Sequence, residues 1–168
     1  MNQETSVSEV QAIDVHGHYG VYFRGVSQLV DRFMTGDASV IVSRASQSNI
    51  GWSIVSPLLA LLPRFKADAV AGNKEAVRVV TQTKSLLQWV VVNPLQPETY
   101  EQANEMLKMA KCVGIKIHPE EHGYPITEHG REIFEFAAGL NVIVLTHSGE
   151  QNSLPMDFVP FANDFPEV

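Results

Sequence analysis

Short apolar runs alternate with longer helical patterns along this sequence, and this alternation restricts the possible fold more than any other feature. Runs with strand character occupy residues 12–16, 52–56, 87–92, 113–118 and 142–147. Strands that alternate with helices are typical of parallel βα units. The sequence therefore predicts an α/β fold with about five parallel strands.

Helical patterns fill the intervals between these runs. Residues 38–49 contain a β-branched stretch, but the βα rhythm favours a helix there. Asn73 is predicted to cap a helix that runs to about Thr83. Further helices are predicted at residues 26–34, 97–111, 128–140 and 156–163.

Five βα units in this order favour an incomplete (β/α)8 barrel in which strands 6–8 are missing, because a complete barrel needs about 250 residues. An open doubly wound sheet fits the length of 168 residues better,. That alternative is weakened because the sequence has no Gly-x-Gly-x-x-Gly fingerprint,. Residues 1–9 are predicted to be a flexible tail, and residues 10–168 the N-terminal part of the barrel domain.

The composition excludes several classes of partner. The net charge of −7 leaves no basic surface for nucleic acid or an anionic membrane,. Cys112 is the only cysteine, so no intrachain disulfide can form, and we expect it in the core,. The apolar runs are far shorter than the ~20 residues that cross a bilayer. We expect a cytoplasmic protein that acts on a small molecule, with self-association left open.

The first strand ends in Asp14-Val15-His16-Gly17-His18. Because side chains alternate along a strand, His16 and His18 should point the same way, and Ile13 and Val15 should face the surrounding helices. Two imidazoles at the C-terminal end of a strand can ligate one metal ion. A His-x-His pair can also cap a strand through local hydrogen bonds, so the motif alone leaves both interpretations open.

Two other predicted strands end in histidine, at His118 and His147. Parallel strands bring these ends to one rim, and four converging histidines favour a metal site, for which zinc is the first candidate. Lys116 shares a strand face with His118. It could line the active site, bridge metals as a carbamate, or pair with a carboxylate such as Asp14. His118 could bind substrate or metal.

The segment after the fourth predicted strand offers groups for acid–base chemistry. Glu120 and Glu121 are expected in a solvated loop, whereas His122 is a candidate for binding substrate or supporting the site. His129 is expected at the surface.

These motifs together resemble the amidohydrolase-related family of the amidohydrolase superfamily. The resemblance rests on Ile13-Asp14-Val15-His16-Gly17-His18, Gly114-Ile115-Lys116-Ile117-His118-Pro119 and Val144-Leu145-Thr146-His147-Ser148-Gly149. That family includes metal-dependent hydrolases and decarboxylases of the aminocarboxymuconate-semialdehyde type.

The resemblance implies that His16, His18 and His147 hold a divalent ion, with Zn²⁺ the first expectation. It also implies hydrolysis of an amide, ester or lactone. The alternatives are decarboxylation of an aromatic or unsaturated acid and, from another class, a metal-binding module without catalysis. The family's later histidine motif and its metal-binding aspartate have no match here. The expectation is therefore a C-terminally truncated enzyme that is inactive alone, with no catalytic residue assigned.

A half-barrel leaves its first and fifth strands as open edges beside apolar helix faces, which invites association. We predict that the 168-residue chain alone is poorly soluble or oligomeric and has no turnover. Extension by roughly 100 residues should give a monodisperse enzyme. Size-exclusion chromatography and activity assays check this; an active monomer of the short chain would contradict the barrel prediction.

Overall fold

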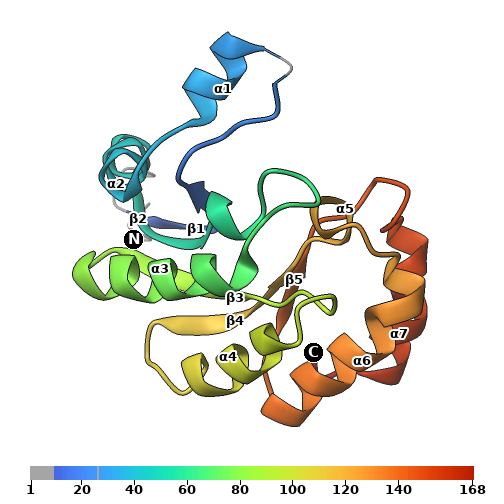
Figure 1. The fold of residues 1–168 in the computed structure, drawn as a ribbon. Helices are drawn as coiled ribbons and strands as arrows, with labels where there is room; N and C mark the ends of the chain where they lie inside the picture. Colours follow the sequence, from blue (N-terminus) through green and yellow to red (C-terminus); the bar gives the residue numbers. More distant parts are fainter. Residues whose placement is uncertain (1–9, 26) are drawn as a thin grey trace, which may run out of the picture.

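The computed structural model describes residues 10–25 and 27–168, so the predicted tail at residues 1–9 lies outside the described residues. Five parallel strands form one curled sheet in the order β1-β2-β3-β4-β5 (Figure 1). The strands are β1 (Ala12–Tyr19), β2 (Ile50–Pro57), β3 (Leu86–Val91), β4 (Cys112–Ile117) and β5 (Val144–Thr146). Each predicted strand is confirmed, although β5 is shorter than expected.

Helices follow the strands in the predicted rhythm. They are α1 (Gln28–Met34), α2 (Ala38–Gln47), η2 (Leu58–Ala60), α3 (Ala69–Gln82), α4 (Glu98–Met106), α5 (Pro119–His122), α6 (Ile126–Leu140), η3 (Pro155–Phe158) and α7 (Val159–Asp164). The helix favoured at residues 38–49 is confirmed as α2. The segment predicted at 97–111 ends early, at Met106, and the one at 156–163 divides into η3 and α7.

The strand order decides between the two predicted architectures. Each strand pairs with the next one along the chain, and the order does not reverse within the described sheet. A doubly wound sheet needs such a reversal, where its cofactor crevice forms. The incomplete (β/α)8 barrel is therefore confirmed, and the doubly wound alternative was wrong.

The main core lies between the later strands and their helices. Val90, Ile115 and Ile117 are fully buried and belong to one cluster with Ile133 and Ala137 of α6. Cys112 is buried in the same cluster, as the sequence predicted. Burial of a Val or Ile side chain contributes roughly 1.5–3 kcal/mol, so this layer fixes β3 and β4 against α4 and α6.

The start of α3 differs from the prediction because another residue caps it. Asp68 is the N-cap, and its carboxylate accepts a hydrogen bond from the Ala71 amide. Asn73 lies inside the helix, fully buried. Its amide side chain binds the backbone of Val91 through both a donor and an acceptor, at 2.8 Å each. Asn73 therefore joins α3 to the end of β3 instead of starting the helix.

The expectation that Ile13 and Val15 pack against helices was wrong. Their exposed fractions are 60% and 54%. β1 is an edge strand with a single neighbour, and between Asp14 and Gly17 it advances three residues while β2 advances two. This irregularity breaks the simple alternation of side chains, and α2 buries none of its residues. β1 is thus held mainly by its pairing with β2.

The segment after β4 is also more ordered than predicted. Residues 119–122 form α5, and the Glu120 and Glu121 side chains are buried instead of solvated. Glu120 accepts hydrogen bonds from the backbone and side-chain amides of Asn152. These carboxylates are buried because hydrogen-bond donors from distant segments meet them, which a local sequence pattern does not show.

In the described part of the chain, no helix combines the length and apolar character that a bilayer crossing requires.

Gly72 of α3 tests the contact between this helix and η2. A Cβ at Gly72 would lie 2.5 Å from the Ala60 Cβ and 2.7 Å from its backbone nitrogen. We predict that Gly72→Ala lowers the free energy of unfolding by about 1–3 kcal/mol. Gly139→Ala in α6 is the matched control. Its Cβ meets nothing within 4 Å, so alanine should stabilise the helix by about 0.5–1 kcal/mol. Urea unfolding followed by circular dichroism measures both; a stabilising Gly72→Ala would contradict the close packing.

Candidate metal centre

The histidines singled out in the sequence meet at the C-terminal rim of the sheet. The ring centroids of His16 and His18 are 5.1 Å apart. His118 and His147, from the ends of β4 and β5, stack with centroids 4.2 Å apart. Lys116 of β4 links the His118–His147 pair to the His16–His18 pair of β1, because its Nζ lies 3.1 Å from Nε2 of His16. The four imidazoles and the lysine therefore form one cluster, here called the histidine cluster.

His18 is held by the neighbouring strand. Its Nδ1 lies 3.2 Å from the carbonyl oxygen of Ser56 and 3.0 Å from the Ser56 hydroxyl. Because a carbonyl oxygen only accepts, Nδ1 carries the proton and Nε2 keeps a free lone pair. Burial, reinforced by the charge of Lys116, lowers the pKa of His18 to about 4. His18 is thus a neutral ring with the lone pair that a metal ligand needs.

His147 is oriented by a carboxylate. Its Nε2 lies 3.2 Å from Oε1 of Glu150. Burial acts to raise the pKa of Glu150, but hydrogen bonds from Arg64 and His147 hold it below its usual range. The ionised carboxylate accepts from Nε2, so Nδ1 is the His147 ring nitrogen that is left to bind a metal ion,. A carboxylate behind a histidine is a common support for metal-binding imidazoles.

His118 and His122 have different local roles. Nδ1 of His118 accepts the Glu121 amide at the start of α5. Burial, with His147 and Lys116 nearby, lowers the pKa of His118 to about 2. His122 donates from Nε2 to the carbonyl of Ala60 at 2.9 Å, which ties α5 to η2. His118 is therefore part of the histidine cluster, whereas His122 is buried beside it. His129 is half-buried and packs edge-on against Tyr124.

Lys116 takes none of the carboxylate partners that were considered for it. It is fully buried, and within the described residues its hydrogen-bond partner is His16. Burial lowers its pKa to about 8. Asp14 instead accepts the backbone amide of His16 and borders a hollow beside α2. His18 borders the same hollow, and the register of β1 against β2 shifts between Asp14 and Gly17.

The donor chemistry of the cluster fits a divalent ion, since neutral imidazole is the commonest protein ligand for zinc and also suits iron and nickel. The placement does not enclose an ion as it stands. Within residues 10–25 and 27–168, no three His, Cys, Asp or Glu side chains form a group that could hold a metal. Lys116 Nζ lies at the Nε2 lone pair of His16. Metal binding by His16 would require this ammonium to move.

Several contributors to this rim were not found by sequence reasoning. Arg24 and Arg64 both contact the buried carboxylate of Glu121, and Arg64 also reaches Glu150 at 3.2 Å. Both arginines follow the C-terminal ends of strands, in the loops where barrels place their functional residues. Their position in the loops after β1 and β2 could have marked them as candidate site residues from the sequence. Their meeting with Glu121 and Glu150 depends on the tertiary fold.

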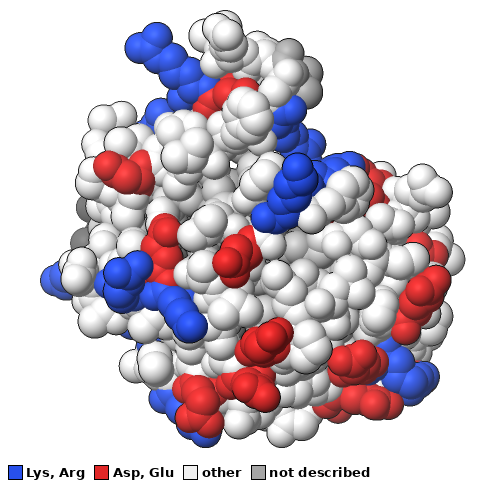
Figure 2. Space-filling view, in the orientation of Figure 1, with Lys and Arg blue, Asp and Glu red and all other residues white. Residues whose placement is uncertain are grey.

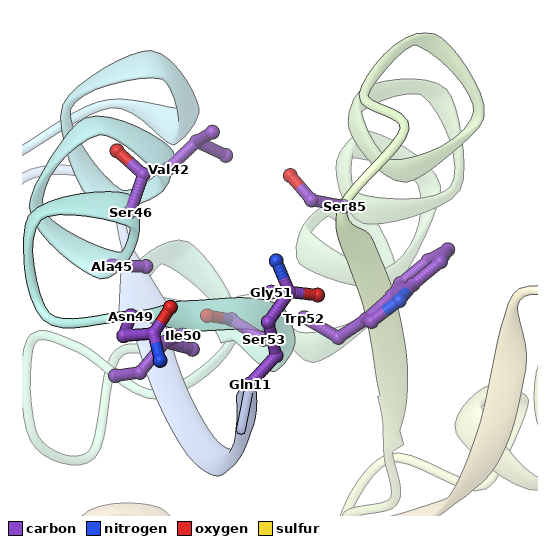
Figure 3. A pocket seen from close by; sticks show the side chains of 10 residues that line it. All are labelled: Gln11, Val42, Ala45, Ser46, Asn49, Ile50, Gly51, Trp52, Ser53 and Ser85. Carbon is purple, nitrogen blue, oxygen red and sulfur yellow. The ribbon is translucent and has the colours of Figure 1, made fainter. Parts of the chain in front are cut away.

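A second hollow lies at the opposite end of the strands (Figure 3). It has a volume of about 230 Å³, and its lining comes from α2, the starts of β2 and β3, and Gln11. These lining side chains are uncharged and include no histidine. Because barrels carry their chemistry at the C-terminal end, the histidine cluster is the candidate site.

No family model and no curated protein matches the sequence. Solved structures with a similar fold include two enzymes. A 2,6-dihydroxybenzoate decarboxylase from Rhizobium superposes with a TM-score of 0.62 at 13% sequence identity. A probable 2-pyrone-4,6-dicarboxylic acid hydrolase from Acinetobacter baumannii, with citric acid bound, gives 0.58 at 16%. Both cover 94% of this chain, and this chain covers 55% of each of them. At these identities the likeness shows the fold.

Lys116 supplies a test of the cluster's energetics. A buried ammonium whose partner is an imidazole costs stability, because no anion compensates its lost hydration. We predict that Lys116→Met raises the free energy of unfolding at neutral pH by about 1–3 kcal/mol. Lys111→Met is the control, since Lys111 donates to the carbonyls of Val80, Thr83 and Lys84. Its loss should destabilise the chain by about 1–3 kcal/mol. Urea titration compares them, and a destabilised Lys116→Met would contradict the uncompensated charge.

Proposed function

We propose that this chain carries the metal-binding side of a metal-dependent hydrolase of the amidohydrolase-related type. The observation that supports it is the convergence of His16, His18 and His147 on one barrel rim, with lone pairs at Nε2 of His18 and Nδ1 of His147. The proposed substrate is a small organic molecule with an amide, ester or lactone bond. The names of the two similar structures, a decarboxylase and a hydrolase, are the reaction classes that the sequence resemblance implies.

In this proposal His16, His18 and His147 hold a divalent ion, with Zn²⁺ as the first candidate. Such an ion supplies Lewis acidity and lowers the pKa of a bound water to about 7. Ser56 fixes the proton of His18 on Nδ1, and Glu150 fixes that of His147 on Nε2. These two contacts leave Nε2 of His18 and Nδ1 of His147 as the ring nitrogens that would bind the ion,.

Lys116 and His118 complete the proposed site. Lys116 brings a positive charge to His16 in a buried position, where it can stabilise a developing negative charge on substrate,. His118 remains neutral over the physiological range because burial lowers its pKa. Because its Nδ1 accepts the Glu121 amide, the neutral ring carries its proton on Nε2 and can donate a hydrogen bond from there to substrate,. No residue of this sequence is assigned the carboxylate role that the resemblance implies.

Decarboxylation of an aromatic or unsaturated acid is the second candidate. The decarboxylase has the higher TM-score of the two similar structures. The same three histidines would serve, so the substrate pocket decides between the reactions. A metal-binding module without catalysis is the remaining alternative, and it would take up metal without turnover of either substrate class.

The metal assignment is tested by binding. We predict that wild-type protein, stripped with chelator and dialysed against Zn²⁺, retains about one ion per chain. The double variant His16→Ala/His18→Ala should retain none, since two of three ligands are lost. Elemental analysis gives the stoichiometry, and the visible spectrum of the Co²⁺ form reports on the ligands.

His129→Ala is the matched control, because His129 lies at the start of α6 outside the histidine cluster. It should bind metal as the wild type does. Full metal retention by the double variant would refute the ligand assignment.

A further inference from the structure

A pocket beside the histidine cluster has a polar wall that the metal proposal does not use. It has a volume of about 380 Å³ and is lined by Phe23, Arg24, Pro63, Arg64 and Glu150. Small-molecule sites start at about 300 Å³, so this pocket can take a single ring with its substituents. It adjoins the cluster through Glu150, whose Oε1 contacts Nε2 of His147.

The guanidinium groups of Arg24 and Arg64 are both anchored by the buried carboxylate of Glu121. Both contact Oε1 of Glu121, a carboxylate whose side chain is only 1% exposed. The loop that carries Arg24 is fixed by Asp31, which accepts the backbone amides of Arg24 and Gly25. The arginines are thus preorganised at one position, which reduces the entropic cost of binding an anion.

Both arginines also keep hydrogen-bond donors for a ligand. Their side chains are 39% and 35% exposed. Arg64 uses Nε and Nη2 for Glu121 and Nη2 for Glu150, and Arg24 uses Nη2 for Glu121. Within the described residues, Nη1 of each arginine has no hydrogen-bond partner. A guanidinium carries five N–H donors in a planar fork that matches a carboxylate.

The surroundings favour a carboxylate on an apolar body. Phe23 is 63% exposed and borders the pocket with Pro63. Figure 2 shows basic side chains gathered over the loop after β2, below the projecting α1, while acidic side chains cover α4 and α6. Because Arg24 and Arg64 are paired with Glu121 and Glu150, the pocket offers an anion directed N–H donors and not a surplus of positive charge,.

We propose that Arg24 and Arg64 form a carboxylate-binding subsite, with Phe23 and Pro63 in contact with the apolar body of the ligand. The subsite's part in catalysis rests on the proposed function, because it would hold one end of the substrate beside His147. Its binding of a carboxylate stands independently. The proposal therefore narrows the substrate class to small carboxylic acids with an apolar body.

The test uses benzoate as the probe and benzamide as its uncharged counterpart. Chelator-treated wild-type chain is titrated with each, and binding is followed by heteronuclear NMR. Benzoate should bind at least about tenfold more tightly than benzamide, since charge-assisted hydrogen bonds to guanidinium are roughly twice as strong as neutral ones. Equal affinities would overturn the proposal, and so would tighter binding of phenyl phosphate than of benzoate.

Two variants assign the binding to these residues. Arg24→Gln, on an exposed loop, should weaken benzoate about tenfold without loss of the fold, and Arg64→Gln should do the same. Arg131→Gln is the control, because Arg131 pairs with Glu135 and Asp164 on the far helices. Wild-type affinity in folded Arg24→Gln and Arg64→Gln would overturn the assignment.

The His16→Ala/His18→Ala variant separates this inference from the metal proposal. It should lose Zn²⁺ but retain benzoate binding, because neither histidine lines the pocket. If the wild type fails to bind metal but binds benzoate through Arg24 and Arg64, the proposed function fails and the subsite stands. Loss of benzoate binding in the folded histidine variant would contradict a separate subsite.

Discussion

The parallel hydrogen-bond ladder from β1 to β5 is the constraint on which the candidate site depends. Because each strand pairs with the next and all run the same way, their C-terminal ends must meet at one rim,. His18, His118 and His147 lie at the ends of three different strands and are over a hundred positions apart at the extremes. A change of one strand's direction would separate them. The core beneath, where Val90, Ile115 and Ile117 pack against the helices, keeps β3 and β4 in position.

The rim contains buried ionisable side chains that lower the stability of the fold, together with hydrogen-bond partners that orient those side chains. Lys116 is a buried cation beside an imidazole, and the buried histidines resist protonation. Such groups cost stability and are retained where they serve chemistry. Glu150 and Ser56 give the opposite contribution, since they orient His147 and His18 through hydrogen bonds. These hydrogen bonds determine which ring nitrogen of His18 and of His147 is left to bind a ligand.

The contact between Lys116 and His16 also means that the Lys116 ammonium and a metal ion would compete for Nε2 of His16. Nε2 of His16 can accept from the ammonium or ligate a metal ion, but it has one lone pair for both,. Occupation by metal would therefore be coupled to the position of Lys116. Beyond this contact, the Arg24–Glu121–Arg64 group offers positive charge that is already anchored. The two proposals, a cation at the histidines and an anion at the arginines, therefore concern different parts of the rim.

The sequence by itself determined the alternation of strands and helices and the identity of the candidate ligands, and the strand order of the structure then decided for the incomplete barrel. Apolar runs of strand length, separated by helical segments, are a local property, and so is a histidine at the end of such a run. The sequence pattern alone therefore places His16, His18, His118 and His147 on one rim. Tertiary structure alone decided the partners. Asp14 accepts the backbone amide of His16 and makes no pair with Lys116, and the packing of α5 buried Glu120 and Glu121. Arg24 and Arg64 meet Glu121, which lies far from both of them in the sequence. Such contacts depend on how loops cross the rim, and no periodicity in the sequence encodes that path.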